Sequence, residues 1–339
     1  MSGTSLDGLD LCLVKFSGQD YLDYEILKAD TVKYPTHLAT LLAKGINLSS
    51  VELTQLDIDL GKYIGQAINT FLDEKIDFIA SHGHTIFHQP KSGVTLQIGS
   101  GIVIHTITHY PVIYDFRTLD VALGGQGAPL VPIGDKYLFS NYVSCINFGG
   151  IANLSYQQKG QRIAFDICPV NMALNTLASE LSLPFDNNGE LARTGNIIPE
   201  MLDQLNQLDY YNIEGPKSLG IEWYNFNFRS IISKREYPVE DRLRTVCEHI
   251  AIQVTNVLKN VDNGKVLITG GGAYNTFLID LIKQKGSHEF VVPTAELVEY
   301  KEALIFAFLG LLKKEGRINV LSAVTGAKLD SSSGQMVGF

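Results

Sequence analysis

The sequence lacks the features of membrane, secreted and disulfide-bonded proteins. No apolar run reaches the roughly 18 residues of a membrane-spanning helix, and no secretory signal peptide is recognisable at the start. The four cysteines (Cys12, Cys145, Cys168 and Cys247) are scattered, with no CxxC pair. This spacing favours buried thiols over disulfides or a zinc site. We therefore expect a soluble, cytoplasmic protein with no membrane partner.

Basic residues are also scarce. The chain has 27 Lys and Arg against 36 Asp and Glu, a formal net charge of -9, and no basic run. This balance argues against a nucleic-acid partner, although a small anionic ligand needs only a few local donors. What the chain does have is apolar residues (45%) and 31 glycines within 339 residues. That profile is typical of a compact α/β enzyme with two domains.

The first ten residues combine glycines, hydroxyls and acids. The residues concerned are Gly3, Thr4, Ser5, Leu6, Asp7, Gly8 and Asp10. Small residues let the backbone approach a bulky anion, so that amide and hydroxyl donors can surround phosphate oxygens. The carboxylate of Asp7 would repel a phosphate unless a cation lay between them, which indicates Mg²⁺. The alternative is a polar turn between two strands.

Hydrophobic periodicity predicts the main elements. The expected strands are Leu9–Phe16 and Tyr24–Tyr34 (an antiparallel pair), Asp77–Ser81, Pro111–Phe116, Tyr142–Phe148, Arg162–Ile167 and Lys265–Thr269. The expected helices are Ser50–Glu74, Val170–Leu181, Asp241–Val261 and Lys301–Lys314. The segment from Leu183 to Trp223 is rich in turn residues and is interpreted as an insertion or lid.

Two polar loops follow strands in the first half. The loop Ser81–Thr85 holds His82 and His84, with His88 shortly after, but no carboxylate or cysteine lies beside them. Ligand hydrogen bonding is therefore favoured over metal ligation, with plain loop structure as the alternative. In the second loop Arg117 can fork onto a carboxylate, although an ordinary surface ion pair fits the pattern too. A glycine-rich turn, Gly124–Pro129, follows it.

The second half repeats the opening pattern. The turn Gly149–Ser155 follows an expected strand, which is compatible with two similar lobes that share a cleft. Asp166 ends the returning strand, where it can act as a general base or cap the next helix. The turn Gly270–Asn275 suits close approach by a base or ribose. Glu302 begins the last long helix, where an acid is often only a dipole partner.

These runs together resemble one family, the anhydro-N-acetylmuramic acid kinases of the sugar kinase/actin/Hsp70-type ATPase superfamily. The matching segments occur in family order and span essentially the whole chain. They are Met1–Asp10, Ser81–Thr85, Asp115–Asp120, Gly124–Leu130, Asn147–Asn153, Pro216–Ser218, Gly270–Asn275 and Glu302–Ala307.

The resemblance implies a two-lobed, actin-like ATPase (ribonuclease H-like) α/β fold with an active-site cleft between the lobes. Residues 1–138 would form the N-terminal lobe, with the first phosphate loop and sugar contacts. Residues 139–339 would carry the second phosphate loop, the catalytic acid and the adenosine motif. The implied enzyme of peptidoglycan recycling and amino sugar catabolism is a homodimer that uses ATP and Mg²⁺. It opens the 1,6-anhydro ring of anhydro-N-acetylmuramic acid with water and phosphorylates O6, giving N-acetylmuramic acid 6-phosphate and ADP.

The resemblance also implies roles for individual residues. Asp166 would take a proton from the attacking water, and Glu302 is the second candidate catalytic residue. The expected ATP contacts are Gly3, Thr4, Ser5, Leu6, Asp7, Gly8, Asp10, Gly149, Gly150, Asn153, Gly270, Gly271, Gly272 and Asn275. The expected sugar contacts are His82, His84, Thr85, Arg117, Asp120 and Asn171. Asp7 would act on Mg²⁺ through the phosphates.

Two departures from the family pattern leave alternatives open. The loop after the catalytic acid has the sequence Ile167-Cys168-Pro169-Val170 where the family has Thr-Gly-Pro-Gly, and Asn175 replaces a later acid. The family also places a short strand before the segment that starts here at Met1. We expect an unpaired sheet edge there, and a mis-assigned or trimmed start. The alternatives are a related kinase of a non-anhydro sugar, or a degenerate kinase that only binds ligand.

Overall fold

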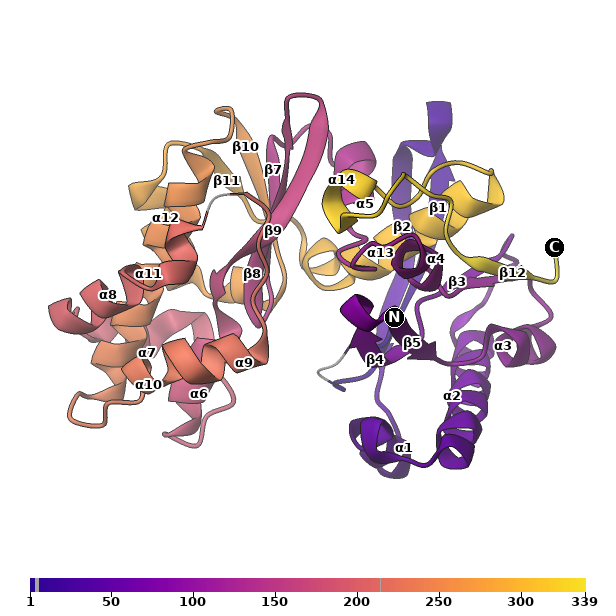
Figure 1. Cartoon of the computed structure of the whole chain (residues 1–339), viewed down its shortest axis with the longest axis horizontal. Helices are drawn as coiled ribbons and strands as arrows, with labels where there is room; N and C mark the ends of the chain where they lie inside the picture. The colour runs from indigo at the N-terminus through magenta and orange to yellow at the C-terminus, as the bar shows by residue number, and fades with distance from the viewer. Residues whose placement is uncertain (4–5, 214) are drawn as a thin grey trace. The chain divides into compact units, whose positions relative to one another are not determined.

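The computed structural model describes residues 1–3, 6–213 and 215–339 and divides the chain into two compact units. The first comprises Met1–Leu138 with Tyr300–Phe339, and the second comprises Phe139–Glu299. The elements are labelled in Figure 1. The sequence assigns residues 139–339 to one lobe, whereas residues 300–339 pack with the first unit. The reason is that the final strand, Gln335–Val337, pairs with Val112–Tyr114 of that unit.

The first unit is built from short sheets and helices. Its strands are β1 (Leu9–Ser17), β2 (Asp23–Val32), β3 (Ile79–Ser81), β4 (His84–Gln89), β5 (Val94–Ile98), β6 (Val112–Tyr114) and β12 (Gln335–Val337). Its helices are α1 (Thr36–Ala43), α2 (Ser50–Phe71), α3 (Gly101–Thr108), α4 (Thr118–Ala122), α5 (Pro132–Leu138) and α14 (Ser322–Thr325). Helix α13 (Ala295–Lys314) contains the boundary between the units.

The predicted long helix and the first strand pair are confirmed. Helix α2 starts with a capping box, in which the Ser49 hydroxyl accepts from the Glu52 N–H and the Glu52 carboxylate accepts from the Ser49 N–H. Its apolar face buries Leu56, Leu60, Ile64 and other residues in the core of this unit. Strand β1 pairs antiparallel with β2.

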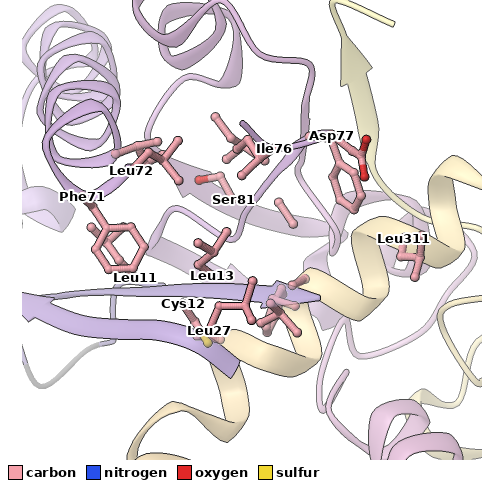
Figure 2. A pocket seen from close by; sticks show the side chains of 18 of the residues that line it. Leu11, Cys12, Leu13, Leu27, Phe71, Leu72, Ile76, Asp77, Ser81 and Leu311 are labelled. Carbon is pink, nitrogen blue, oxygen red and sulfur yellow. The ribbon is translucent and has the colours of Figure 1, made fainter. Parts of the chain in front are cut away.

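Besides its pairing with β2, strand β1 is bridged within the described residues at Leu9, which pairs antiparallel with Ser2. Strand β3, in turn, is paired only with β6 in that part of the chain. A cavity of about 920 Å³ lies between these elements, lined by β1, by residues 76–81, by the end of α2 and by α13. Figure 2 shows apolar side chains from three of these segments, Leu13, Ile76 and Leu311 among them, around this space.

The second unit has one mixed sheet covered by helices. Its strands are β7 (Ser144–Phe148), β8 (Ile151–Gln158), β9 (Gln161–Pro169), β10 (Lys265–Thr269) and β11 (Glu289–Val291). Its helices are α6 (Asn171–Ser179), α7 (Glu190–Thr194), α8 (Pro199–Asn206), α9 (Ile221–Trp223), α10 (Arg229–Ile232), α11 (Val239–Leu258) and α12 (Thr276–Lys285).

The strand order of this sheet is β11-β10-β7-β8-β9. Strands β7, β8 and β9 form an antiparallel meander, and β10 and β11 add parallel to β7. This is the ribonuclease H-like arrangement, so the predicted α/β fold class is confirmed. Helices α11 and α12 supply many of the residues that pack in the core of this unit, such as Val246, Ile250 and Ile282.

The segment from Leu183 to Trp223 is more ordered than its sequence suggests. It forms α7, α8 and α9, and it buries Met201, Leu205 and Tyr210. These helices are so short that turn residues interrupt the helical periodicity, which is why the sequence reads as an insertion or lid. The packed side chains make it part of the second unit's core.

Three of the four cysteines, Cys145, Cys168 and Cys247, are buried, as expected for structural thiols, whereas Cys12 is partly exposed. Within residues 1–3, 6–213 and 215–339, no group of three or more His, Cys, Asp or Glu side chains could hold a metal ion. None of the described helices combines the length and the apolar character that crossing a bilayer requires.

Candidate active site

The opening segment forms a closed turn in the first unit. The amide of Asp10 donates to the Met1 carbonyl at 2.9 Å, and the Leu6 amide donates to the Gly3 carbonyl at 3.3 Å. Leu6 adopts a left-handed conformation (φ 59°), which a leucine rarely does outside a constrained turn. A Cβ at Gly8 would lie 2.9 Å from the Val32 carbonyl oxygen, so this close approach to β2 requires glycine. The predicted ATP contacts Thr4 and Ser5 lie outside the described residues.

The two acids of this segment differ in environment. Asp7 is exposed, whereas Asp10 is half-buried and its Oδ1 accepts from the Thr31 hydroxyl at 2.7 Å. Because no larger cluster of acids or histidines surrounds them within the described chain, these carboxylates do not form a protein cage for a metal. They fit a Mg²⁺ ion that is held mainly by nucleotide phosphates and water.

The histidine-containing segment at the junction of β3 and β4 is largely buried, and its histidines form hydrogen bonds within the protein. His84 Nδ1 lies 2.9 Å from the Ser2 hydroxyl, and burial lowers the pKa of this imidazole. His88 is more exposed and contacts the Thr95 hydroxyl at 3.1 Å. Thr85 lies on β4, opposite Gln97. In the described chain the three histidines join no metal-binding cluster.

Arg117 joins this loop to the glycine-rich turn. Its Nε and Nη2 lie 3.0 and 2.8 Å from His82 Nε2, and its Nη1 donates to the Gly127 carbonyl at 2.6 Å. Burial, followed by the charge of Arg117, lowers the pKa of His82 to about 3. The imidazole is therefore neutral and accepts hydrogen bonds from the guanidinium. Burial also lowers the pKa of Arg117, and the charges of Glu302 and Asp120 oppose that shift.

Asp120 is wholly buried, and both of its carboxylate oxygens are used inside the protein. One accepts from the Gly127 amide and the other from the Thr325 hydroxyl, each at 2.7 Å. A Cβ at Gly125 would lie 2.3 Å from the same carboxylate. The sequence predicts Asp120 as a sugar contact, but its position is that of a residue holding the glycine-rich turn in place.

Glu302 lies in the first unit, on α13. Its side chain is exposed to solvent, yet many protein atoms lie around its carboxyl group. Those surroundings raise the pKa of its carboxyl, and the charge of Arg117 opposes the shift. In the structure, the charge of Arg117 therefore acts on both His82 and Glu302, so these three residues form one electrostatically coupled group.

Two glycine-rich turns meet at one edge of the second unit's sheet. Gly149 and Gly150 follow β7, and Gly270 to Gly272 follow the adjacent parallel strand β10. A Cβ at Gly270 would lie 2.9 Å from the Phe148 carbonyl oxygen, and one at Gly272 would lie 3.2 Å from Asn171 Oδ1. Only glycine allows this close approach, which creates a backbone-lined edge where open α/β sheets bind ligands.

Asn171 and Asn275 are both engaged within the protein. Asn171 Nδ2 donates to the Phe148 carbonyl at 3.0 Å, next to the two glycine turns. Asn275, predicted as an ATP contact, caps helix α12 by accepting from the Leu278 amide at 3.0 Å. Its side chain is buried, so its position fits a structural role.

Asp166 lies on β9, opposite Asn153 of β8, and is fixed from three sides. Its Oδ2 accepts from the Leu219 amide at 2.8 Å. Its own amide donates to the Lys217 carbonyl at 3.0 Å, and its carbonyl accepts from the Tyr210 hydroxyl at 2.6 Å. Burial raises the pKa of its carboxyl, and the Leu219 hydrogen bond opposes the shift.

This geometry corrects one alternative for Asp166. The N-cap position of α6 is Val170, and no side chain caps that helix, so Asp166 is not a helix cap. Reasoning from the sequence did not find Tyr210 and Leu219 as its supports. The only signal was the Pro216–Ser218 motif, which lies against Asp166 in the fold. Cys168 and Val170, the departures from the family pattern, are fully buried core residues.

The chain was also compared with known proteins. Residues 1–338 match the protein family described as "Anhydro-N-acetylmuramic acid kinase". A relative of that name from Bacillus cereus (strain 03BB102) is 34% identical over 363 residues, covering 97% of this chain and 95% of the relative. Another from Saccharophagus degradans is 33% identical over 360 residues, covering 98% and 96%.

The chain also resembles solved structures of sugar kinases at low sequence identity. A ROK family glucokinase from Streptomyces griseus, in complex with glucose and AMPPNP, is 12% identical with a TM-score of 0.32, over 68% of this chain and 82% of that one. A hexokinase from Schistosoma mansoni complexed with glucose is 11% identical with a TM-score of 0.33, over 88% and 83%. Matches at this level carry no functional argument.

Proposed function

This chain belongs to the anhydro-N-acetylmuramic acid kinase family, and we propose from that membership a reaction carried by the residues described above. The substrates are ATP, water and 1,6-anhydro-N-acetylmuramic acid. The products are N-acetylmuramic acid 6-phosphate and ADP. The predicted kinase activity is confirmed by the family and its relatives, and neither alternative gains support. The reaction belongs to peptidoglycan recycling.

Asp166 acts as the general base in this proposal. The water oxygen attacks C1 of the sugar, its proton passes to the Asp166 carboxylate, and the C1–O6 bond breaks. The freed O6 then attacks the γ-phosphorus of ATP, and ADP leaves. The observation that carries this assignment is a half-buried carboxylate, held by the Leu219 amide, whose pKa is raised by burial. Such a group retains a proton more readily than an ordinary aspartate.

The sugar contacts are proposed in the first unit. The guanidinium of Arg117 recognises the lactyl carboxylate, because a planar fork of N–H donors matches two carboxylate oxygens. Glu302, whose charge acts on Arg117, contacts the sugar hydroxyls in this proposal. His84 and Thr85, the first two residues of β4, complete this group.

The nucleotide contacts are proposed along the glycine-rich turns. Gly149, Gly150 and Gly270 to Gly272 offer backbone amides at the carboxyl ends of β7 and β10, which suits phosphates and adenosine. Gly3 to Asp10 forms the other phosphate loop. Mg²⁺ would offset phosphate charge, and Asp7 and Asp10 are the residues that would hold it through the phosphates or water.

We further propose a cytoplasmic homodimer, on the basis of the family alone. Sedimentation velocity on the purified chain tests the oligomeric state. A single species of monomer mass at micromolar concentration would contradict the dimer.

Turnover of three sugars tests the proposed reaction. With ATP and Mg²⁺, we expect phosphorylation of 1,6-anhydro-N-acetylmuramic acid and little of N-acetylmuramic acid or N-acetylglucosamine. Faster turnover of either non-anhydro sugar would favour a kinase that acts without hydrolysis. Binding of ATP with no turnover of any sugar would favour a protein that only binds ligand.

A further inference from the structure

His82 has one defined protonation state in the fold. Its Nδ1 lies 2.9 Å from the Gly83 carbonyl oxygen, and a carbonyl can only accept, so Nδ1 carries the ring hydrogen. In the neutral ring, Nε2 then presents its lone pair to the Nε and Nη2 of Arg117. Both ring nitrogens are therefore used inside the protein, and neither remains for the sugar contact that the sequence predicts.

The ring of His82 is also held in place by packing. The side chain is 6% exposed, and Phe306 of α13 packs edge-on against it, with ring centroids 4.7 Å apart. Phe116 packs in turn against Phe306, at 5.5 Å. A ring fixed on its faces and at both nitrogens presents its acceptor in one direction only.

Arg117 retains donors that no group of the described residues accepts. A guanidinium has five N–H groups. In the described chain, His82 accepts one from Nε and one from Nη2, and the Gly127 carbonyl accepts one from Nη1. One N–H on each terminal nitrogen is left over. No carboxylate within the described residues forms an ion pair with Arg117, although charges in protein interiors are normally paired. Both observations point to an anionic ligand with two acceptor oxygens.

We infer that His82 is a positioning residue, which holds Arg117 so that its two remaining N–H groups meet the carboxylate of the substrate. The inference rests on the proposed function, in which Arg117 recognises the lactyl carboxylate. His82 thus contributes to specificity without touching the sugar. A positively charged or absent imidazole would leave the guanidinium free to turn, and the paired donors would no longer match the two oxygens.

Substrate preference tests this role. The readout is the ratio of kcat/KM for 1,6-anhydro-N-acetylmuramic acid to that for 1,6-anhydro-N-acetylglucosamine, which lacks the lactyl carboxylate. His82→Leu should lower this ratio about 10- to 100-fold, the range expected for a lost hydrogen bond to a charged group. His82→Gln, whose amide oxygen can accept from Arg117, should recover most of it. His37→Leu, at an exposed histidine of α1 in the same unit, is the matched control and should leave the ratio unchanged.

A double-mutant comparison separates positioning from general damage. If His82 acts through Arg117, then adding His82→Leu to Arg117→Gln should lower the ratio no further than Arg117→Gln alone. The shorter His82→Asn keeps a polar amide but does not reach Arg117, so it should behave like His82→Leu and serves if the leucine variant is unfolded.

Two results would overturn the inference in distinguishable ways. A ratio that is high in the wild type and unchanged in the Leu and Asn variants, with both sugars slowed equally, would make His82 merely structural. A wild type with no preference for the carboxylate-bearing sugar would contradict the proposed role of Arg117, and the inference would fall with it.

Discussion

At the scale of single residues, burial and one backbone hydrogen-bond donor have opposite effects on the pKa of Asp166. Burial raises the pKa of its carboxyl, and the Leu219 amide partly offsets this by donating to the ionised form. A general base must be deprotonated to accept a proton, so activity should be present above this pKa and lost as the pH falls through it. Under the proposed mechanism, we therefore expect the hydrogen bond from Leu219 to influence the pH at which activity is lost.

A proline substitution tests this directly. Leu219→Pro removes the N–H that Asp166 accepts, so the pKa of the carboxyl should rise further. We expect the acid limb of the kcat/KM profile to move to higher pH by about one unit, the value of one charge-assisted hydrogen bond. Leu219→Ala keeps the N–H and is the matched control. Coincident acid limbs in the two variants would show that this hydrogen bond does not tune the base.

At the scale of elements, a residue that the sequence assigns to the site can instead stabilise the end of a helix, as Asn275 does. Asn275 belongs to a motif next to three glycines, and its position alone is consistent with an adenosine contact. In the fold its side-chain oxygen caps α12, while the neighbouring glycines form the backbone edge. Asp120 likewise turns inward to hold a loop.

Substitution of Asn275 distinguishes the two roles. Asn275→Ala should lower the free energy of unfolding by about 1 kcal/mol, because the N-cap is lost, with little change in the KM for ATP. Asn275→Asp keeps an acceptor oxygen and should retain stability. Urea denaturation and ATP saturation curves measure both quantities. A large rise in the KM for ATP at unchanged stability would restore the role predicted from the sequence.

The capping box at the start of α2 can be tested in the same way, at a position that is not part of the proposed active site. Ser49→Ala removes the hydroxyl that accepts from the Glu52 amide and should cost about 1 kcal/mol of stability. Ser50→Ala is the matched control, since Ser50 is also exposed and is not the cap. Urea denaturation of the two variants compares them. Equal stability would mean that the capping box contributes nothing measurable.

At the scale of the whole molecule, buried histidines couple stability to pH. His249 is completely buried, and its two ring nitrogens contact Asn206 at 2.7 Å and the Tyr211 hydroxyl at 2.9 Å. Burial lowers the pKa of His249 to about 3, from an ordinary value of 6.5. Between these values the unfolded chain binds a proton that the folded chain does not, so stability is full above pH 6.5 and falls as the pH is lowered.

Replacing His249 should flatten that dependence. One histidine contributes a slope of up to about 1.4 kcal/mol per pH unit below pH 6.5. His249→Gln should remove this contribution to the slope, whereas His105→Gln, at a half-buried histidine of α3, should leave the slope unchanged. Urea denaturation between pH 7 and pH 5 gives the slopes. Equal slopes for wild type and His249→Gln would contradict the linkage.

Local patterns are enough to predict much of this molecule. The 22 residues of α2, and strands β7 and β10 that precede the glycine turns of the second unit, have clear sequence patterns, so the sequence predicts them. Contacts between distant segments are not encoded in any local pattern. The partner of Asp120 is Thr325, 205 positions away, and β12 joins β6 across most of the chain. For that reason the sequence misplaces residues 300–339 and misses the supports of Asp166.

The most direct test of the account is the mass of the sugar product formed in ¹⁸O-water from ATP and 1,6-anhydro-N-acetylmuramic acid, with Asp166→Asn run beside the wild type. We predict that the wild type yields a 6-phosphorylated product with one heavy oxygen at C1, and that Asp166→Asn yields essentially none. Labelled product at the wild-type rate from Asp166→Asn would remove Asp166 from the mechanism. An unlabelled phosphorylated product from the wild type would contradict the coupling of hydrolysis to phosphoryl transfer.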